Sequence, residues 1–129
     1  MTLPRAEVRR KIKLVWLVDV DEESQEAATD TERDQVYASH GALFERLKAD
    51  NAFVAGEEFK VSATATTVRN GKAGNMIEKG PAVVGREQLG GFYLIEAPDL
   101  SVALDYARTL PGTTEVRPIE AFRDSTGRP

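Results

Sequence analysis

The single histidine of the chain, His40, is the residue best suited to acid–base chemistry. An imidazole titrates near neutral pH, so it accepts or donates a proton under physiological conditions. His40 lies four residues after Val36 and four before Phe44, which places it on or beside the apolar stripe of an expected helix. Partial burial there suits a catalytic imidazole, and it also suits a structural one bonded to a backbone carbonyl or a tyrosine. Both interpretations stay open.

Catalysis by His40 requires a partner, and three carboxylates are candidates. Asp19 lies near the end of the first expected strand, and Glu57 follows Gly56 in the second. Strand ends and bulges often open onto a pocket, so we predict Asp19 and Glu57 as the catalytic partners. Asp105, on the second expected long helix, is a weaker candidate. The alternative for each is an ordinary surface or structural charge.

We expect a small-molecule pocket between the helix that carries His40 and the sheet. Trp16 and Tyr93 belong to expected strands and Phe44 to the helix, so we predict that their rings line this pocket. Phe92 and Tyr93 point to opposite faces of the sheet. The strand register therefore decides which ring lines the pocket and which lies at a subunit interface.

Two further segments have both a binding and a structural interpretation. The hydroxyl-rich segment 64–67 leads to Arg69 and suggests a site for an anion or polar ligand, although β-propensity alone explains its threonines. Gly90 and Gly91 lack the spacing and the following helix of a phosphate-binding loop. We interpret them as glycines that permit strands or subunits to approach closely.

The composition excludes several classes of site. The chain has no cysteine, which rules out disulfides, thiolate zinc sites and cysteine nucleophiles. One histidine and carboxylates without the spacing of a calcium loop lead us to predict no metal and no cofactor.

Charge and hydropathy set limits on partners and location. The net charge of −4 argues against a nucleic-acid surface. The basic residues between Arg5 and Lys13 are interpreted as a solvated flank, with an anionic contact as the alternative. The longest apolar run, 14–18, is too short to span a membrane, and no signal peptide precedes it. We therefore predict a soluble, cytoplasmic protein without a membrane partner.

The elements that position these residues follow from periodicity and from helix and strand breakers. A chain of 129 residues accommodates one domain, which we place at 11–122, after an N-terminal extension (1–10) and before a C-terminal tail (123–129). The acidic segment 21–30 is expected to be a loop. Long helices are expected at 31–50 and from 99 to about 110, and strands at 11–20, 53–59, 63–69, 72–78, 90–97 and 115–122.

Local signals mark the ends of these elements. Thr31 and Asp34 have capping-box spacing at the start of the first long helix, and Asp99 is the expected N-cap of the second. Asn70-Gly71 is a strong signal for the turn of a β-hairpin.

Without the inserted hairpin, the order of elements is βαββαβ, which predicts an α+β protein of ferredoxin-like fold with both helices on one face of an antiparallel sheet. The first strand is apolar on both sides, with Ile12, Leu14 and Trp16 on one and Val15 and Leu17 on the other. Two helices cannot cover both faces of the sheet. We therefore predict a homodimer that packs sheet against sheet, a dimeric α+β barrel.

The segments that carry these elements are similar to a known family. The sequences AGE at 55–57, TATTVR at 64–69, EQLGGFYLIE at 87–96 and EVRP at 115–118 resemble the YCII-related family, in particular its DGPF subgroup, over about residues 12–119. The resemblance implies a dimeric α+β barrel with a largely uncharacterised function. It also implies a regulatory or stress-linked role, because DGPF proteins are often associated with extracytoplasmic-function sigma factors.

The chain departs from the family pattern at two places. Shorter members carry a proposed His–Asp pair; His40 matches that histidine, but the aspartate falls near Leu110, where no carboxylate stands. The subgroup's signature tetrapeptide is KGPA at 79–82, without its acidic and aromatic positions.

Two main functions stay open, with a purely structural dimer as a third alternative. One is a His40-dependent lyase or isomerase acting on a small polar or aromatic compound, a class inferred by analogy with the fold. The other is a non-catalytic binding or regulatory module linked to a sigma-factor system, which the missing aspartate and the KGPA segment favour. Whether the protein is an enzyme is left undecided at this point.

Overall fold

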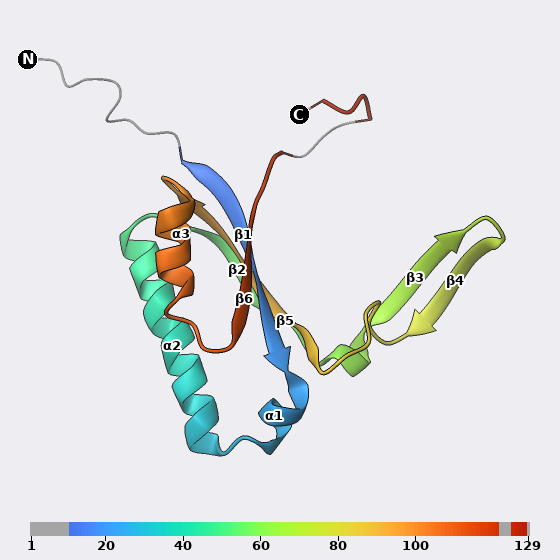
Figure 1. Cartoon of the computed structure of the whole chain (residues 1–129), viewed down its shortest axis with the longest axis horizontal. Helices are drawn as coiled ribbons and strands as arrows, with labels where there is room; N and C mark the ends of the chain where they lie inside the picture. The colour runs from blue at the N-terminus through green and yellow to red at the C-terminus, as the bar shows by residue number, and fades with distance from the viewer. Residues whose placement is uncertain (1–10, 122–124, 129) are drawn as a thin grey trace, which may run out of the picture.

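The computed structural model describes residues 11–121 and 125–128 of the chain (Figure 1). The predicted N-terminal extension lies outside the described residues, as do positions 123, 124 and 129 of the predicted C-terminal tail. The described elements are β1 (Ile12–Asp21), α1 (Glu22–Ala27), α2 (Asp30–Ala49), β2 (Phe53–Glu58), a short 3₁₀ helix (Ser62–Thr64), β3 (Thr66–Gly71), β4 (Gly74–Lys79), β5 (Glu87–Ala97), α3 (Leu100–Ala107) and β6 (Thr113–Pro118).

Four strands form an antiparallel sheet in the order β2-β5-β1-β6, and β3 and β4 form a separate hairpin. The long helices α2 and α3 lie on the same side of the sheet, while the hairpin projects away from it (Figure 1). This is the strand order of the ferredoxin-like fold, so the predicted α+β class and its inserted hairpin are confirmed. Strand β6 is at an edge, where Pro118 is tolerated because an edge strand can lack a backbone donor.

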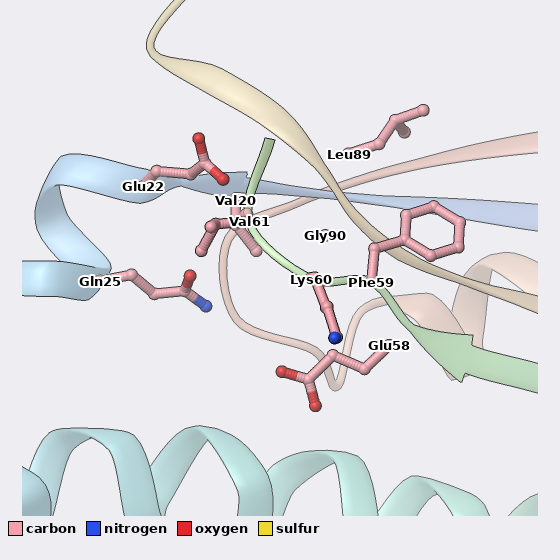
Figure 2. Close-up of a pocket in the computed structure, with 9 residues that line it drawn as sticks. All are labelled: Val20, Glu22, Gln25, Glu58, Phe59, Lys60, Val61, Leu89 and Gly90. Carbon is pink, nitrogen blue, oxygen red and sulfur yellow. The ribbon is translucent and has the colours of Figure 1, made fainter. Parts of the chain in front are cut away.

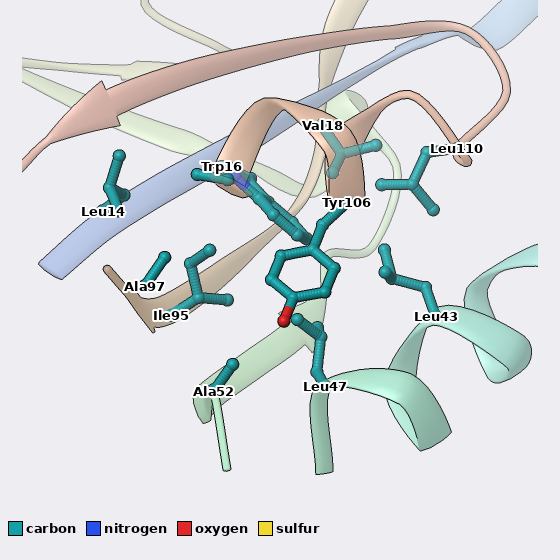
Figure 3. Close-up of a cluster of buried hydrophobic side chains, with 11 residues drawn as sticks. Leu14, Trp16, Val18, Leu43, Leu47, Ala52, Ile95, Ala97, Tyr106 and Leu110 are labelled. Carbon is teal, nitrogen blue, oxygen red and sulfur yellow. The ribbon is translucent and has the colours of Figure 1, made fainter. Parts of the chain in front are cut away.

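The hydrophobic core lies between the sheet and the two long helices (Figure 3). Leu14, Trp16 and Val18 alternate along the central strand β1 and are at most 6% exposed. Leu47 of α2 and Tyr106 of α3 close the core from the helix side. Full burial of a large apolar side chain contributes about 1.5–3 kcal/mol to folding, so this face of the sheet holds the helices in place.

Tyr106 also makes a polar contact between α3 and the end of α2. Its hydroxyl donates to Oδ2 of Asp50 at 2.5 Å, and the guanidinium of Arg46 lies 4.6 Å from the centre of its ring. Burial, together with the Asp50 carboxylate, raises the pKa of Tyr106 to about 12. The contact joins the C-terminal end of α2 to α3 while the rest of the Tyr106 ring packs in the core.

The prediction of a loop at 21–30 was wrong, because α1 forms within this segment. Asp21 caps the helix by accepting a hydrogen bond from the backbone N of Ser24 at 3.1 Å. The Glu22 carboxylate accepts from the backbone N of Ser62 at 2.7 Å. A helix of six residues is too short to show a periodic apolar stripe, and none of its residues is buried, so it depends on its cap and on tertiary contacts.

The N-terminal cap of α2 lies two residues before the predicted one. Thr29 Oγ1 accepts from the backbone N of Glu32 at 3.1 Å, and Glu32 Oε1 accepts from the backbone N of Thr29 at 3.3 Å. A glutamate reaches back to the N-cap backbone, whereas the residue three positions after Thr31 is a shorter aspartate. The prediction for Asp99 is confirmed, because it caps α3 by accepting from Val102 N at 2.9 Å.

The predicted hairpin is present, but its turn lies two residues later than expected. Gly71 pairs with Gly74, so Lys72 and Ala73 form the turn and Asn70 belongs to β3. Gly74 has φ of 111°, a conformation that favours glycine, so the shifted register places a glycine where the turn requires one.

We expect Tyr106→Phe to lower the free energy of unfolding by about 1–2 kcal/mol at pH 7, because Asp50 loses its hydrogen-bond donor. The folded-state pKa of Tyr106 is raised from 10.0 to about 12. The contact therefore contributes fully below pH 10, and its contribution is lost as the pH rises towards 12. Denaturant titrations of both proteins over this range measure the effect. A stability difference that does not shrink above pH 10 would contradict the assignment.

Candidate functional site

His40 lies on the side of α2 that faces the sheet, and its partner is Tyr93 of β5. The Nδ1 atom of His40 and the hydroxyl oxygen of Tyr93 are 2.5 Å apart, and the two rings are stacked with 5.8 Å between their centres. Tyr93 is paired with Trp16 in the β1–β5 ladder, which puts it on the helix side of the sheet. Of the two alternatives for Phe92 and Tyr93, it is therefore Tyr93 that faces α2.

The environment keeps both members of this pair uncharged at neutral pH. Partial burial lowers the pKa of His40 below 6.5, and a smaller effect of the negative charge on Glu58 opposes that shift. Burial is also the main cause of the raised pKa of Tyr93, and Glu58 adds to it. A single hydrogen bond joins these two neutral groups. The imidazole proton is on Nδ1 if the imidazole donates to the hydroxyl, and on Nε2 if the hydroxyl donates to the imidazole.

Glu58, the last residue of β2, is a carboxylate whose charge acts on His40, although it was not among the predicted partners. Its Oε1 accepts a hydrogen bond from the hydroxyl of Tyr37 at 2.7 Å, and Tyr37 lies one helical turn before His40. The Glu58 carboxylate raises the pKa of Tyr37, mainly through this hydrogen bond. We call Tyr37, His40, Glu58 and Tyr93 the His40 cluster.

Tyr37 and Glu58 were not predicted as site residues. The spacing of three residues between Tyr37 and His40 is the signal that would have indicated Tyr37. For Glu58 the obstacle is an irregularity in β2, where the pairing with β5 shifts between Phe53 and Ala55. The extra residue reverses the alternation of the strand beyond it.

This shift places Glu57 on the face of the sheet away from the helices. Phe53 pairs with the buried Ile95, so simple alternation from Phe53 would bring Glu57 to the helix side. After the shift, Gly56 pairs with Tyr93 and Glu57 pairs with Phe92. The structure therefore brings Glu58, rather than Glu57, to His40.

Asp19 also lies on the face away from the helices. It pairs with Thr113 in the regular β1–β6 ladder, two positions after Leu17, and Leu17 points away from the buried Trp16. The third candidate, Asp105, accepts from Nη1 of Arg108 at 2.6 Å on the exposed side of α3. None of the three predicted carboxylates lies next to His40.

Gly56 and Gly91 lie where β2 and β5 approach each other closely. A Cβ on Gly91 would lie 2.7 Å from the carbonyl oxygen of Glu57, and one on Gly56 would lie 3.2 Å from that of Phe92. The tight contact between β2 and β5 thus depends on these two residues, in line with the structural interpretation of the Gly90-Gly91 pair.

Each ring predicted to line a pocket packs against another aromatic ring. Trp16 is fully buried, with its ring centre 5.5 Å from that of Tyr93, and its Nε1 has no hydrogen-bond partner among the described residues. Phe44 packs edge-on against Phe53 at 4.9 Å. The contact with Trp16 supports Tyr93, the member of the His40 cluster that comes from β5.

A pocket of about 390 Å³ lies beside this cluster, at the end of β2 (Figure 2). Its walls come from the junction of β1 and α1, from the chain that follows β2 and from β5. In Figure 2 the side chains of Gln25, Glu58 and Lys60 extend into the space above α2. Glu58 belongs to both the pocket and the His40 cluster, so it connects the two.

The hydroxyl-rich segment and Arg69 make contacts within the chain. Arg69 donates from Nε to Glu78 Oε2 at 3.3 Å and from Nη2 to the carbonyl oxygen of Ala82 at 2.9 Å. Thr67 Oγ1 donates to the carbonyl oxygen of Gly80 at 2.7 Å. These groups attach the hairpin to the loop that follows it.

Metal clusters and membrane-spanning helices are both absent from the described part of the chain. Within residues 11–121 and 125–128, no three histidine, aspartate or glutamate side chains gather closely enough to hold a metal ion. No helix among the described residues is both long and apolar enough to cross a membrane.

The fold and site define a ferredoxin-like α+β protein with a histidine–tyrosine pair between its first long helix and the sheet. The YCII-related domain matches residues 13–123, so the chain belongs to the YCII-related family. An uncharacterised protein from Rhizobium meliloti (strain 1021) is 37% identical in an alignment of 68 residues that covers 48% of the chain and 55% of that relative. The chain thus matches about half the length of this curated relative.

His40 is the only histidine in the sequence, so its ring signals can be followed by ¹⁵N NMR in untagged protein. We expect a pKa below 6.5, because burial disfavours the imidazolium. Its contribution to stability is therefore complete above about pH 6.5 and is lost as the pH falls below it. A measured pKa above 6.5 would contradict this environment.

Tyr93→Phe is expected to change the ¹⁵N shift of Nδ1, because that atom loses its hydrogen-bond partner. Tyr37→Phe is the matched control, since it removes a hydroxyl that contacts Glu58 and leaves the His40–Tyr93 contact in place. Equal effects of the two variants on Nδ1 would argue against a direct contact.

Proposed function

We propose that this YCII-related protein binds a small organic molecule in the pocket at the end of β2 and that His40 acts on it as an acid–base group. The observation that carries the proposal is the 2.5 Å contact between His40 Nδ1 and the Tyr93 hydroxyl, next to a carboxylate that also lines the pocket. A neutral, half-buried imidazole is the form that accepts a proton from a substrate. The reaction class that fits is a lyase or isomerase step.

Each member of the His40 cluster has a distinct role in this mechanism. His40 removes a proton from the substrate and returns it to another substrate atom or to the leaving group, so the imidazole ends in its starting form. Tyr93 is a positioning residue that holds the ring by its hydrogen bond at Nδ1. The negative charge on Glu58 favours the transient imidazolium, since it acts to raise the pKa of His40.

We propose that the protein is a homodimer that packs through the face of the sheet away from the helices. Val15 and Leu94 pair on that face, as do Leu17 and Phe92. The long helices lie only on the opposite side (Figure 1). A second copy packed on this face would cover these side chains, and apolar side chains on an uncovered sheet favour such association.

A second candidate function is a non-catalytic binding or regulatory module, favoured by the partner of His40. Its hydrogen bond is made to a tyrosine and not to a carboxylate, and Leu110 is only 8% exposed within the core. The motifs at 64–69 and 87–96 lead us to propose that the chain belongs to the DGPF subgroup. If the protein is a regulatory module of this kind, we propose that it is linked to a sigma-factor system.

A metabolite-library thermal-shift screen, followed by NMR detection of turnover, tests the acid–base proposal. We expect a compound that binds wild type and His40→Gln, with turnover by the variant reduced about 100-fold or more. Ser39→Ala, at the neighbouring position of α2, is the control. Equal turnover by wild type and His40→Gln would contradict the catalytic role, and binding without turnover by either would support the second candidate.

Light scattering tests the homodimer. We expect a dimer at micromolar concentration for wild type and a monomer for Leu94→Glu, because a charge would be placed in the proposed apolar interface. Val84→Glu is the matched control, since Val84 is 89% exposed in the loop before β5. A monomeric wild-type protein would overturn the proposal.

A further inference from the structure

We infer that the pocket at the end of β2 is selective for amphoteric ligands, small molecules that carry both a carboxylate and an ammonium group on an apolar skeleton. This inference rests on the proposed function for the location of the site, and it adds the chemical class of the ligand. Four features of the pocket support it: an unpaired cation, a partly free carboxylate, a second carboxylate that is already occupied, and an apolar wall.

The cation is Lys60, which follows β2 by two residues. Within the described part of the chain, Lys60 forms no hydrogen bond or ion pair, and in Figure 2 its amino group extends into the pocket. An ammonium group placed in this way binds a carboxylate through a charge-assisted hydrogen bond. Lys60 therefore defines the end of the pocket that accepts the acidic group of a ligand.

The anion is Glu58, on the same side of the chain as Lys60. Phe59, between them, turns the other way and packs its ring 6.0 Å from that of Phe92. The Oε1 atom of Glu58 accepts from Tyr37, while its Oε2 makes no hydrogen bond among the described residues. That oxygen is available to an ammonium group of the ligand.

The other carboxylate of the pocket, Glu22, does not compete for this role. One of its oxygens accepts from the backbone N of Ser62 at 2.7 Å and the other accepts from the Ser62 hydroxyl. These hydrogen bonds lower the pKa of Glu22 and use both of its oxygens. The pocket thus offers one available positive group and one available negative group.

The pocket also has an apolar wall. Val20 and Val61 line it, and Val20 packs so closely over Gly90 that a Cβ there would lie 2.6 Å from Val20 Cγ1. A ligand with a single charge would satisfy only one of the two ends. A ligand with both charges on a short branched or aromatic skeleton would satisfy both ends and cover the valines, in a volume of about 390 Å³.

The test compares three probes with one carbon skeleton: L-leucine, 4-methylpentanoate, which lacks the amine, and 3-methylbutylamine, which lacks the carboxylate. The aromatic set of L-phenylalanine, 3-phenylpropanoate and 2-phenylethylamine is measured in parallel by ligand-observed NMR at millimolar concentrations. We expect the amphoteric member of at least one set to bind about tenfold more tightly than either relative.

Variants of the two charged groups identify the ends of the site. Lys60→Met is expected to make the amino acid bind no better than the amine, and Glu58→Gln to make it bind no better than the acid. Lys72→Met, in the turn of the distant hairpin, is the matched control and should keep the wild-type preference. An acid or amine that binds as tightly as its amino acid, an unchanged preference in Lys60→Met, or no binding by either set would overturn the inference.

His40→Gln separates this inference from the proposed function. The variant is expected to keep the preference for the amphoteric probe, because that preference comes from Lys60 and Glu58, which it leaves unchanged. Turnover that survives in His40→Gln would contradict the acid–base role and leave the ligand class standing. Turnover of a singly charged compound by wild type, without any preference for the amphoteric probes, would contradict the ligand class and leave the acid–base role standing.

Discussion

The antiparallel pairing of β1 with β5 is the interaction on which the rest of the structure depends. It sets Trp16 opposite Tyr93 and Leu14 opposite Ile95, and it thereby creates the apolar surface that α2 and α3 cover. Tyr93 has two tasks on that surface. Its ring packs against Trp16 at the edge of the core, while its hydroxyl forms a hydrogen bond with His40. The geometry of the site is therefore held by the same contacts that hold the fold.

The irregularity between Phe53 and Ala55 has a comparable effect on electrostatics. It leaves Phe53 packed against Phe44 and still brings Glu58 to the helix side. Had the strand continued in regular alternation, a carboxylate at position 57 would have faced α2 in its place. One extra residue in an edge strand thus decides which charge acts on His40 and which side chain extends into the neighbouring pocket.

The tyrosine partner of His40 distinguishes this site from a histidine–carboxylate pair. A carboxylate partner would strengthen the imidazole as a base, whereas a neutral hydroxyl fixes the ring and leaves its pKa lowered by burial. In this structure the Glu58 carboxylate acts on His40 through its charge. Its Oε1 atom accepts a hydrogen bond from the hydroxyl of Tyr37. Such an arrangement suits proton transfer on a ligand that itself carries charge, since the ligand can alter the field around the imidazole.

Much of the fold was determined by the sequence alone, because it depends on local signals. Runs of apolar and β-branched residues predicted β1 and most of β5, the helical stripe predicted α2, and Asp99 marked the start of α3. With the hairpin set aside, the order of these elements specifies the ferredoxin-like sheet. The sequence also identified His40 as the centre of the candidate site, because a lone histidine in a chain without cysteine is the side chain whose ordinary pKa lies near neutrality.

The tertiary structure decided which groups meet at that centre. The faces of Glu57 and Glu58 depend on a strand irregularity whose position no local pattern reveals, and α1 depends on contacts with residues far along the chain. The pairing of His40 with Tyr93 joins residues that are 53 positions apart and follows only from the register of β5 under α2. Periodicity predicts which side chains share a face of one helix or strand. How the helices and strands pack on one another then decides which of those side chains come close enough to react together.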